Sequence, residues 1–182
     1  MDLKRFAAIC PCVMLGFLYL SVPALMAQSD EPALMRSCEA QISAKFRQWR
    51  VAPVSPAVEQ FAKGQNTNPT RVSGDFDGDG RRDAALLIME GRDSNPENPN
   101  RLDLLHIAVC MNRLSGAQLF VIDKLYCGDG ISLSRRGARY HDFENEMEGV
   151  YKLDGIHAYC LGQAGATYQF ESGSFRRIVD DD

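Results

Sequence analysis

The sequence has little of what marks most specialised classes of protein. It contains 20 Lys and Arg residues against 24 Asp and Glu residues, so its formal net charge of −4 offers no broad cationic surface for nucleic acid. It has no internal repeat of the kind that a solenoid or a propeller needs. With 45% hydrophobic and 24% charged residues, the composition excludes collagen, a coiled coil and wholesale disorder, and it predicts one globular domain.

Signatures of the common catalytic sites are also missing. The sequence has no Gly-x-Ser-x-Gly elbow and no recognisable Cys-His signature. Its three histidines have no metal-binding partner at helical spacing; they are His106, His141 and His157. Motifs alone therefore predict no active site.

Residues 1–27 have the layout of a secretory signal peptide. Two basic residues precede an apolar run from Phe6 to about Val22, and a small residue, Ala27, closes the segment. We expect cleavage after Ala27, which leaves residues 28–182 as the exported chain with no membrane segment. Because the apolar run is longer than a typical signal core, a retained membrane anchor is the alternative.

Four cysteines follow the leader: Cys38, Cys110, Cys127 and Cys160. None of them has the Cys-x-x-Cys spacing that zinc sites prefer, and an even number in an exported chain predicts two disulfides. The sequence leaves three pairings open. We favour Cys127 with Cys160, and hence Cys38 with Cys110, because the first pair would join two late segments of one sheet.

Residue patterns predict an α+β fold, in which N-terminal helices pack on an antiparallel β-sheet with meander order. Apolar residues recur every three to four positions over 33–49, which predicts a helix. Ser55 and Pro56 predict the cap and the first turn of a short second helix that Gly64 ends. The continuous apolar run 84–89 predicts a buried strand. We expect five later strands, at Leu102–Cys110, Gln118–Tyr126, Gly155–Leu161, Ala166–Phe170 and Ser174–Val179.

The segment that precedes the apolar run reads Gly-Asp-Phe-Asp-Gly-Asp-Gly-Arg-Arg-Asp. Its carboxylates occupy loop positions 1, 3, 5 and 9, which are Asp75, Asp77, Asp79 and Asp83. Calcium takes six to eight oxygen ligands, and a chain supplies them from alternate residues only if it curls tightly. Gly78 and Gly80 permit that curl. We therefore predict a Ca²⁺ site at residues 75–83, in which the carbonyl of Arg81 adds a backbone oxygen and Asp83 closes the shell.

This loop is not an EF-hand, because position 12 falls on apolar Leu86 where that motif requires Glu. A closing aspartate at position 9, followed at once by a strand, resembles the aspartate loop of FG-GAP and VCBS-type repeats, in which calcium lies between a loop and an outgoing strand. The exported chain is also similar to a group of small secreted bacterial proteins with a leading helix and a single DxDxDGxxD loop. That resemblance extends to Asp154-Gly155-Ile156 and to the terminal hairpin, with its segments Tyr168–Phe170, Gly173–Phe175 and Ile178–Asp180. It implies a fold and does not specify an activity, and we expect a calcium ion bound in this loop to be structural.

These features predict a noncatalytic calcium-binding interaction module. We expect a monomer in the periplasm or outside the cell, with a protein or glycan partner in the cell envelope and no affinity for nucleic acid or membrane. The alternative is a cell-wall or glycan hydrolase that uses residues 140–148. There Asp142 could orient His141 for base catalysis, and Glu144, Glu146 and Glu148 form an alternating row of carboxylates. The simpler interpretation of residues 140–148 is a solvated polar segment between strands.

Overall fold

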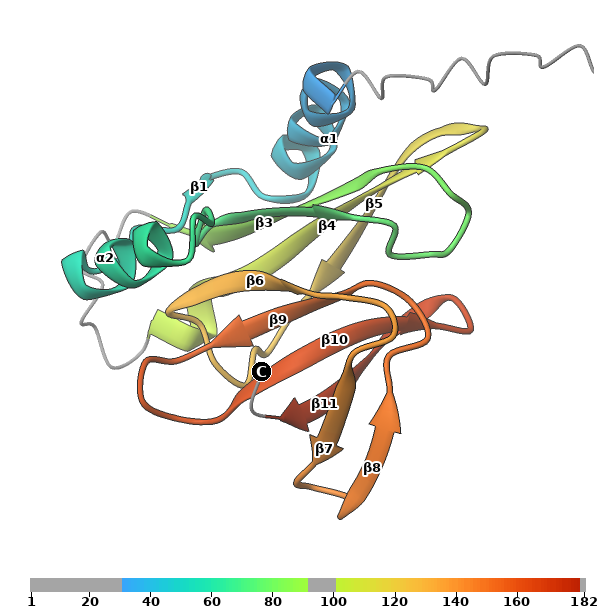
Figure 1. Cartoon of the computed structure of the whole chain (residues 1–182). Helices are drawn as coiled ribbons and strands as arrows, with labels where there is room; N and C mark the ends of the chain where they lie inside the picture. The colour runs from blue at the N-terminus through green and yellow to red at the C-terminus, as the bar shows by residue number, and fades with distance from the viewer. Residues whose placement is uncertain (1–30, 92–100, 181–182) are drawn as a thin grey trace, which may run out of the picture.

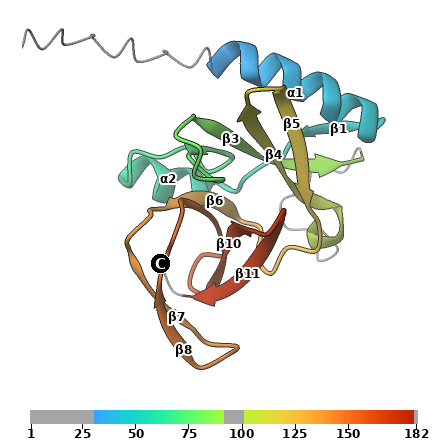
Figure 2. The ribbon, with the colours of Figure 1, turned by 90° about the vertical axis from the view of Figure 1, so that its right-hand side faces the viewer.

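The computed structural model describes residues 31–91 and 101–180, so the expected signal peptide at 1–27 lies outside the described residues. Figures 1 and 2 show three layers: helix α1 (Glu31–Lys45), a five-stranded sheet beneath it, and a four-stranded sheet beneath that. The architecture is α+β, and the strand pairings in both sheets are antiparallel. This agrees with the fold class expected from the sequence.

The five-stranded sheet has the order β1-β3-β4-β5, and β2 pairs with β3 beside β1. Ile88–Glu90 of β3 pair with β1, whereas Asp83–Leu86 pair with β2. The strands are β1 (Trp49–Val51), β2 (Arg71–Gly74), β3 (Asp83–Glu90), β4 (Leu105–Arg113) and β5 (Gly116–Ile122). A 3-10 turn, η1 (Arg101–Leu104), leads directly into β4.

The four-stranded sheet has the order β11-β10-β9-β6. Its strands are β6 (Gly130–Ser134), β9 (Gly155–Tyr159), β10 (Gly165–Glu171) and β11 (Ser174–Asp180). A separate hairpin of β7 (Arg139–Asp142) and β8 (Met147–Val150) projects below this sheet (Figure 1). The amide of Ile131 in β6 donates to the carbonyl of Pro69, just before β2, at 2.7 Å, which ties one corner of the two sheets together.

Strand β3 is buried on both of its faces, and this explains its continuous apolar sequence. Ala84, Leu86 and Ile88 face α1, while Ala85, Leu87 and Met89 face the four-stranded sheet. Successive side chains of a strand point to opposite faces, so a strand between two layers needs apolar residues at every position. The predicted strand at 84–89 is therefore confirmed.

Both predicted helices are present. Helix α1 packs a buried stripe on the five-stranded sheet, formed by Leu34, Met35, Cys38 and Ile42, and Phe46 continues the stripe directly after the helix. Helix α2 (Pro56–Gly64) begins with Ser55 as its N-cap, whose side chain accepts a hydrogen bond from the Val58 amide at 3.3 Å. The predicted end of the first helix was wrong, because α1 ends at Lys45 and Trp49 lies in β1. The apolar spacing continues past the helix because Trp49 packs against the same cluster from the edge of the sheet.

Other expected boundaries also need correction. Residues 102–104 belong to η1 rather than to a strand, and β5 ends at Ile122 rather than at Tyr126. The expected single sheet is two stacked sheets and a hairpin. Residues 140–148 form most of that β7–β8 hairpin and not an irregular connection. Polar alternation in a two-stranded hairpin does not distinguish it from a solvated loop, because neither face is fully buried.

The two expected disulfides are present, in the favoured pairing. Cys38 and Cys110, with Cα atoms 5.9 Å apart, tie α1 to β4. Cys127 and Cys160, with Cα atoms 5.5 Å apart, tie the segment before β6 to the end of β9. Two disulfides fit an oxidising environment. Within 31–91 and 101–180, none of the helices is long and apolar enough to cross a bilayer.

Candidate metal centre

The acidic segment is the loop that joins β2 to β3. Gly74 pairs with Asp83 at the end of the two strands, so residues 75–82 have to turn back between adjacent positions. Phe76 fixes this loop, because its ring is fully buried in the apolar core that both sheets share. The residues on either side of Phe76 alternate with it and therefore direct Asp75 and Asp77 away from that core.

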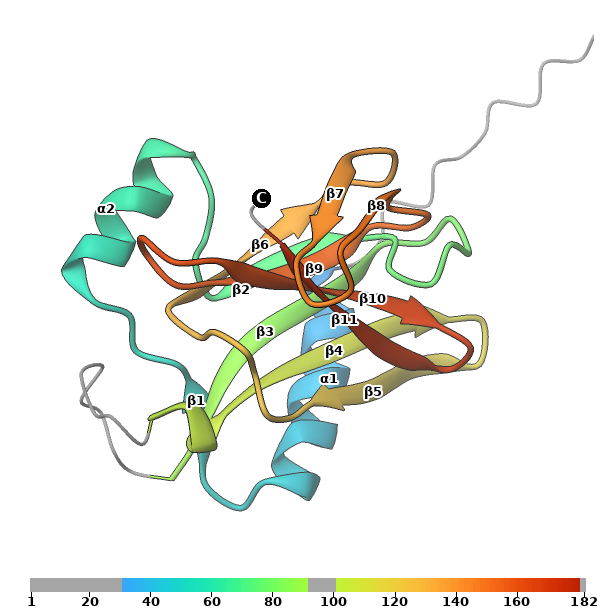
Figure 3. The same ribbon diagram turned by 90° about the horizontal axis from the view of Figure 1, so that it is seen from below.

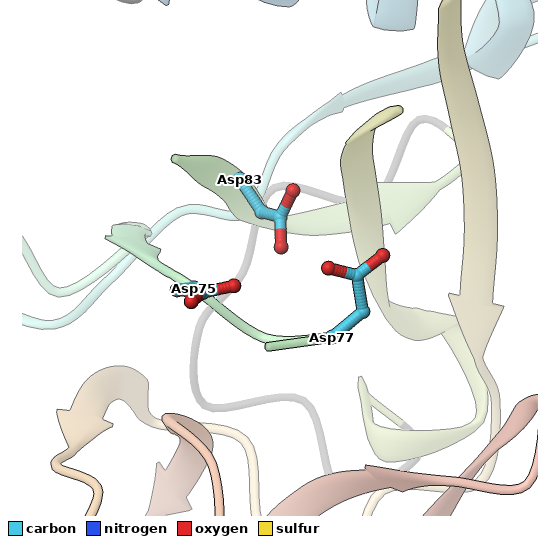
Figure 4. Close-up of side chains that lie close together, drawn as sticks. All are labelled: Asp75, Asp77 and Asp83. Atoms are coloured by element: carbon cyan, nitrogen blue, oxygen red, sulfur yellow. The ribbon is translucent and has the colours of Figure 1, made fainter. Parts of the chain in front are cut away.

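Three carboxylates converge at this loop. Oxygen atoms of Asp75, Asp77 and Asp83 all lie within 4.8 Å of one another, and the side chains face a common space (Figure 4). Asp83 is buried, with 1% of its surface exposed, and the side chain of Asp77 is only 9% exposed. Carboxylate oxygens are the preferred ligands of hard divalent cations, so this group could hold a metal ion.

The curl of the loop depends on the two glycines identified in the sequence. The carboxylate of Asp75 accepts hydrogen bonds from the amides of Gly78, at 2.9 Å, and Gly80, at 3.1 Å. Both glycines have positive φ angles, +78° and +82°. L-residues with a side chain rarely adopt this conformation, which explains why glycine occupies both positions.

Asp83 is the most constrained of the three carboxylates. Its Oδ2 accepts from the Phe76 amide at 2.9 Å, and its Oδ1 accepts from the Asn112 amide at 2.8 Å. Burial raises the pKa of Asp83 to about 6 from its ordinary value of 3.8, although these two hydrogen bonds act in the opposite direction, and the charges of Asp77 and Asp79 add to the rise. A cation at this position would offset the burial of the Asp83 charge, which is the main cause of the raised pKa, and the repulsion from Asp77 and Asp79.

One residue expected in the metal shell, Asp79, has other contacts in the structure. Asp79 lies outside the group of three carboxylates, and its side chain forms an ion pair with the guanidinium of Arg81. The other oxygen of Asp79 accepts from the Arg81 amide at 2.8 Å. The side chain of Arg81 also donates to the carbonyl of Asn112 on β4. For Asp79 to ligate an ion together with the other three, it would have to leave Arg81.

Two residues contact the loop that the sequence did not connect with it, Arg113 and Asp154. Nε of Arg113, at the end of β4, lies 3.2 Å from Oδ2 of Asp77. The carboxylate of Asp154 accepts from the Asp75 amide at 3.1 Å and from the Arg136 amide at 3.0 Å, which links the loop to the segment before β7. No spacing signals Arg113, since it is 36 residues from Asp77 in the chain. Asp154 precedes the Gly-Ile start of β9 but has no acidic neighbour that marks it.

The segment considered for hydrolysis does not gather its acidic groups. His141 and Glu148 are register partners in the β7–β8 hairpin, and they line an open hollow of about 640 Å³ with Tyr140. Both oxygens of Glu144 are instead bound by Arg177, at 2.6 and 2.9 Å. Glu146 lies in the turn of the hairpin with a φ of +51°, and neither it nor Glu144 lines the hollow.

Comparison of the chain with known proteins identified no relative. No family model matches the chain, nor does any curated protein or any solved structure.

Proposed function

We propose that residues 75–83 bind calcium, and that the protein is a noncatalytic interaction module of the periplasm or the extracellular space. The observation that carries the proposal is the convergence of Asp75, Asp77 and Asp83 within 4.8 Å at one end of the sheets. Three like charges at that separation repel one another, and Asp83 is also removed from water. A divalent cation would offset both costs.

Calcium suits this ligand set better than magnesium or zinc. Three carboxylates, a backbone carbonyl and water can supply the six to eight oxygens that calcium takes, whereas magnesium demands a near-ideal octahedron. Zinc prefers nitrogen and sulfur ligands, and the candidate group contains oxygen only. The resemblance of the loop to FG-GAP and VCBS-type loops supports the same choice. Asp79 would join the shell when the ion displaces the ion pair between its carboxylate and the guanidinium of Arg81, and the carbonyl of Arg81 would supply the backbone oxygen.

The bound ion would be structural. The loop connects β2 to the doubly buried β3, and the Asn112 amide on β4 donates to Asp83, so an ion held here would brace the ends of β2, β3 and β4. An ion that binds only the folded state stabilises it by about 2.7 kcal/mol when its concentration is 100 times the dissociation constant. Extracellular calcium sites have dissociation constants on the order of 10⁻⁴–10⁻³ M, and we propose a value in that range.

The contacts of the β7–β8 hairpin favour this module over the hydrolase alternative. A glycosidase needs two carboxylates that flank one bond, and the oxygens of Glu144 are held by Arg177 while Glu146 lies outside the hollow. Two disulfides support a location in the periplasm or outside the cell. The partner we propose is a protein or a glycan of the cell envelope.

Thermal melting tests the calcium site. The mature protein should melt at a higher temperature in calcium than in EGTA, and magnesium should reproduce little of the effect. The double variant Asp75→Asn, Asp77→Asn should lose the response, whereas Asp103→Asn, an exposed acidic residue in η1, should keep it. If calcium and EGTA give the same melting temperature in the unaltered protein, the calcium site does not exist.

A further inference from the structure

A second cluster of polar groups lies on the outer face of the four-stranded sheet. His157, Thr167 and Asp180 are each at most 4% exposed, and they occupy neighbouring positions on β9, β10 and β11. Nδ1 of His157 lies 3.1 Å from Oγ1 of Thr167 and 3.3 Å from Oδ1 of Asp180. The hydroxyl of Tyr151 also donates to Asp180. These buried polar groups therefore form one hydrogen-bonded network. The hydrogen bonds within it offset the free energy that each group loses when it is removed from water.

This network fixes the orientation of the His157 ring. The carboxylate of Asp180 only accepts hydrogen bonds, so the adjacent Nδ1 carries the proton, and in the neutral ring Nε2 is left as an acceptor. The contacts of His157 with Thr167 and Asp180 are both made through Nδ1, on the other side of the ring. A Cβ atom placed on Gly165 would lie 2.5 Å from Nε2, so the ring extends over Gly165 and occupies the space that a larger residue would fill.

His157 also lines a pocket of about 320 Å³ between α2 and the turn from β9 to β10. Phe61 of α2 and Tyr159 of β9 contribute aromatic rings whose centroids are 5.5 Å apart, and Phe61 is 46% exposed. Ser132 and Gln163 add polar side chains. Figures 1 and 3 both show α2 and the β9–β10 turn together, at the end of the molecule opposite the β2–β3 loop.

The chemistry of the lining restricts the ligand. No Asp, Glu, Lys or Arg lines this pocket, so a charged ligand would lose water without meeting an opposite charge. The polar groups of His157, Ser132 and Gln163 match a ligand that both donates and accepts hydrogen bonds. Phe61 and Tyr159 suit an apolar ring face. The volume is at the lower end of the range for small-molecule sites, which fits a single ring.

We propose that this pocket binds one neutral sugar ring, with a hydroxyl group donating to Nε2 of His157 and the ring packed against Phe61. Asp180 positions the imidazole, and Gly165 leaves the space that the imidazole needs. The inference names a ligand class for the glycan partner suggested above, but it does not require the metal loop, because the two sites lie at opposite ends of the molecule.

Titration followed by ¹⁵N-¹H NMR tests the proposal. Glucose and N-acetylglucosamine at millimolar concentration should shift the amide signals of residues 157–165 and the Nε2 resonance of His157. Their charged relatives, glucuronate and glucosamine, should bind at least fivefold more weakly. The titration should give the same result in calcium and in EGTA, so a failure of the metal site leaves this result unchanged and the reverse also holds.

Surface variants separate binding from folding. Phe61→Ala and Gln163→Ala alter side chains at the pocket mouth and should weaken sugar binding at least fivefold with an unchanged melting temperature. Leu114→Ala, at a residue that is 95% exposed in the β4–β5 turn, is the control and should bind as the unaltered protein does. The proposal is wrong if no neutral sugar shifts these signals, if the shifts map elsewhere, or if the charged sugars bind equally well.

Discussion

Arg113 holds its Nε 3.2 Å from Oδ2 of Asp77, across the ends of β4 and the β2–β3 loop. Its guanidinium also lies 5.5 Å from the ring centroid of Phe120 and 5.7 Å from that of Phe170. These cation–π contacts keep the charge in place. A positive charge fixed beside the acidic group reduces the repulsion among its carboxylates, and it also opposes the binding of a cation.

Replacing Arg113 should therefore strengthen calcium binding. A unit charge about 6 Å from a divalent ion contributes roughly 1 kcal/mol in a medium as polar as water, so Arg113→Gln should lower the calcium dissociation constant by about three- to tenfold. Isothermal titration calorimetry at low ionic strength measures the change. Arg139→Gln removes an equal charge from an exposed position at the start of β7 and should leave the constant unaltered. Weaker calcium binding by Arg113→Gln would show that this residue supports the loop rather than opposing the ion.

The raised pKa of Asp83 predicts how the metal-free protein responds to pH. The folded state holds the proton of Asp83 more tightly than the unfolded chain, with a pKa of about 6 against 3.8. This contribution to stability is complete below about pH 4 and is lost as the pH rises through 6, on the order of 3 kcal/mol in all. Chemical denaturation in EGTA at pH 4 to 7, compared with Asp83→Asn, isolates the contribution, since the amide does not titrate.

Calcium should reverse the pH dependence of the free energy of unfolding. The ion binds the carboxylate and not the carboxylic acid, so calcium affinity should fall below about pH 6, where Asp83 takes up its proton. Binding isotherms at pH 5 and pH 7.5 check this expectation. Equal affinity at the two pH values would mean that Asp83 is not a ligand.

Phe76 should be required both for the stability of the core and for the conformation of the calcium loop. Removing a fully buried aromatic ring costs about 3–5 kcal/mol, so Phe76→Ala should lower the free energy of unfolding by that amount and weaken calcium binding as well. Phe143→Ala truncates a ring that is 48% exposed on the β7–β8 hairpin and should change stability by less than about 1 kcal/mol. Urea denaturation of both variants gives the comparison. A small effect of Phe76→Ala would contradict its role as the anchor of the loop.

Replacement of Gly78 should destabilise the protein more than replacement of Gly80. Gly78→Ala and Gly80→Ala both place a side chain at positive φ, at a cost of about 1 kcal/mol each. A Cβ atom on Gly78 would in addition lie 2.7 Å from Cδ2 of Leu153, whereas nothing lies within 4 Å at Gly80. Gly78→Ala should therefore be the more destabilising in urea denaturation. Equal losses would mean that Leu153 moves aside freely.

Local sequence specified much of the fold, because the signals are short in range. Ser55 and Pro56 start α2 by capping chemistry, and the apolar residues of β3 permit burial on both faces. Gly78 and Gly80 have the positive φ angles that a tight acidic curl needs. The division into two sheets was missed, because the same alternation of residues fits one sheet or two. Strand partners depend on contacts that are distant in the chain.

The candidate site also has features that the sequence predicts and features that only the tertiary structure shows. The sequence by itself determined that Asp75, Asp77 and Asp83 belong to one glycine-containing loop before a buried strand, since their spacing and the backbone freedom of glycine are local properties. Only the tertiary structure decided that Arg113 neutralises Asp77, that Asp154 holds the Asp75 amide, and that Asp180 orients His157. These pairs join residues from separate strands and loops, and a side chain acquires such a neighbour only when the sheets have stacked.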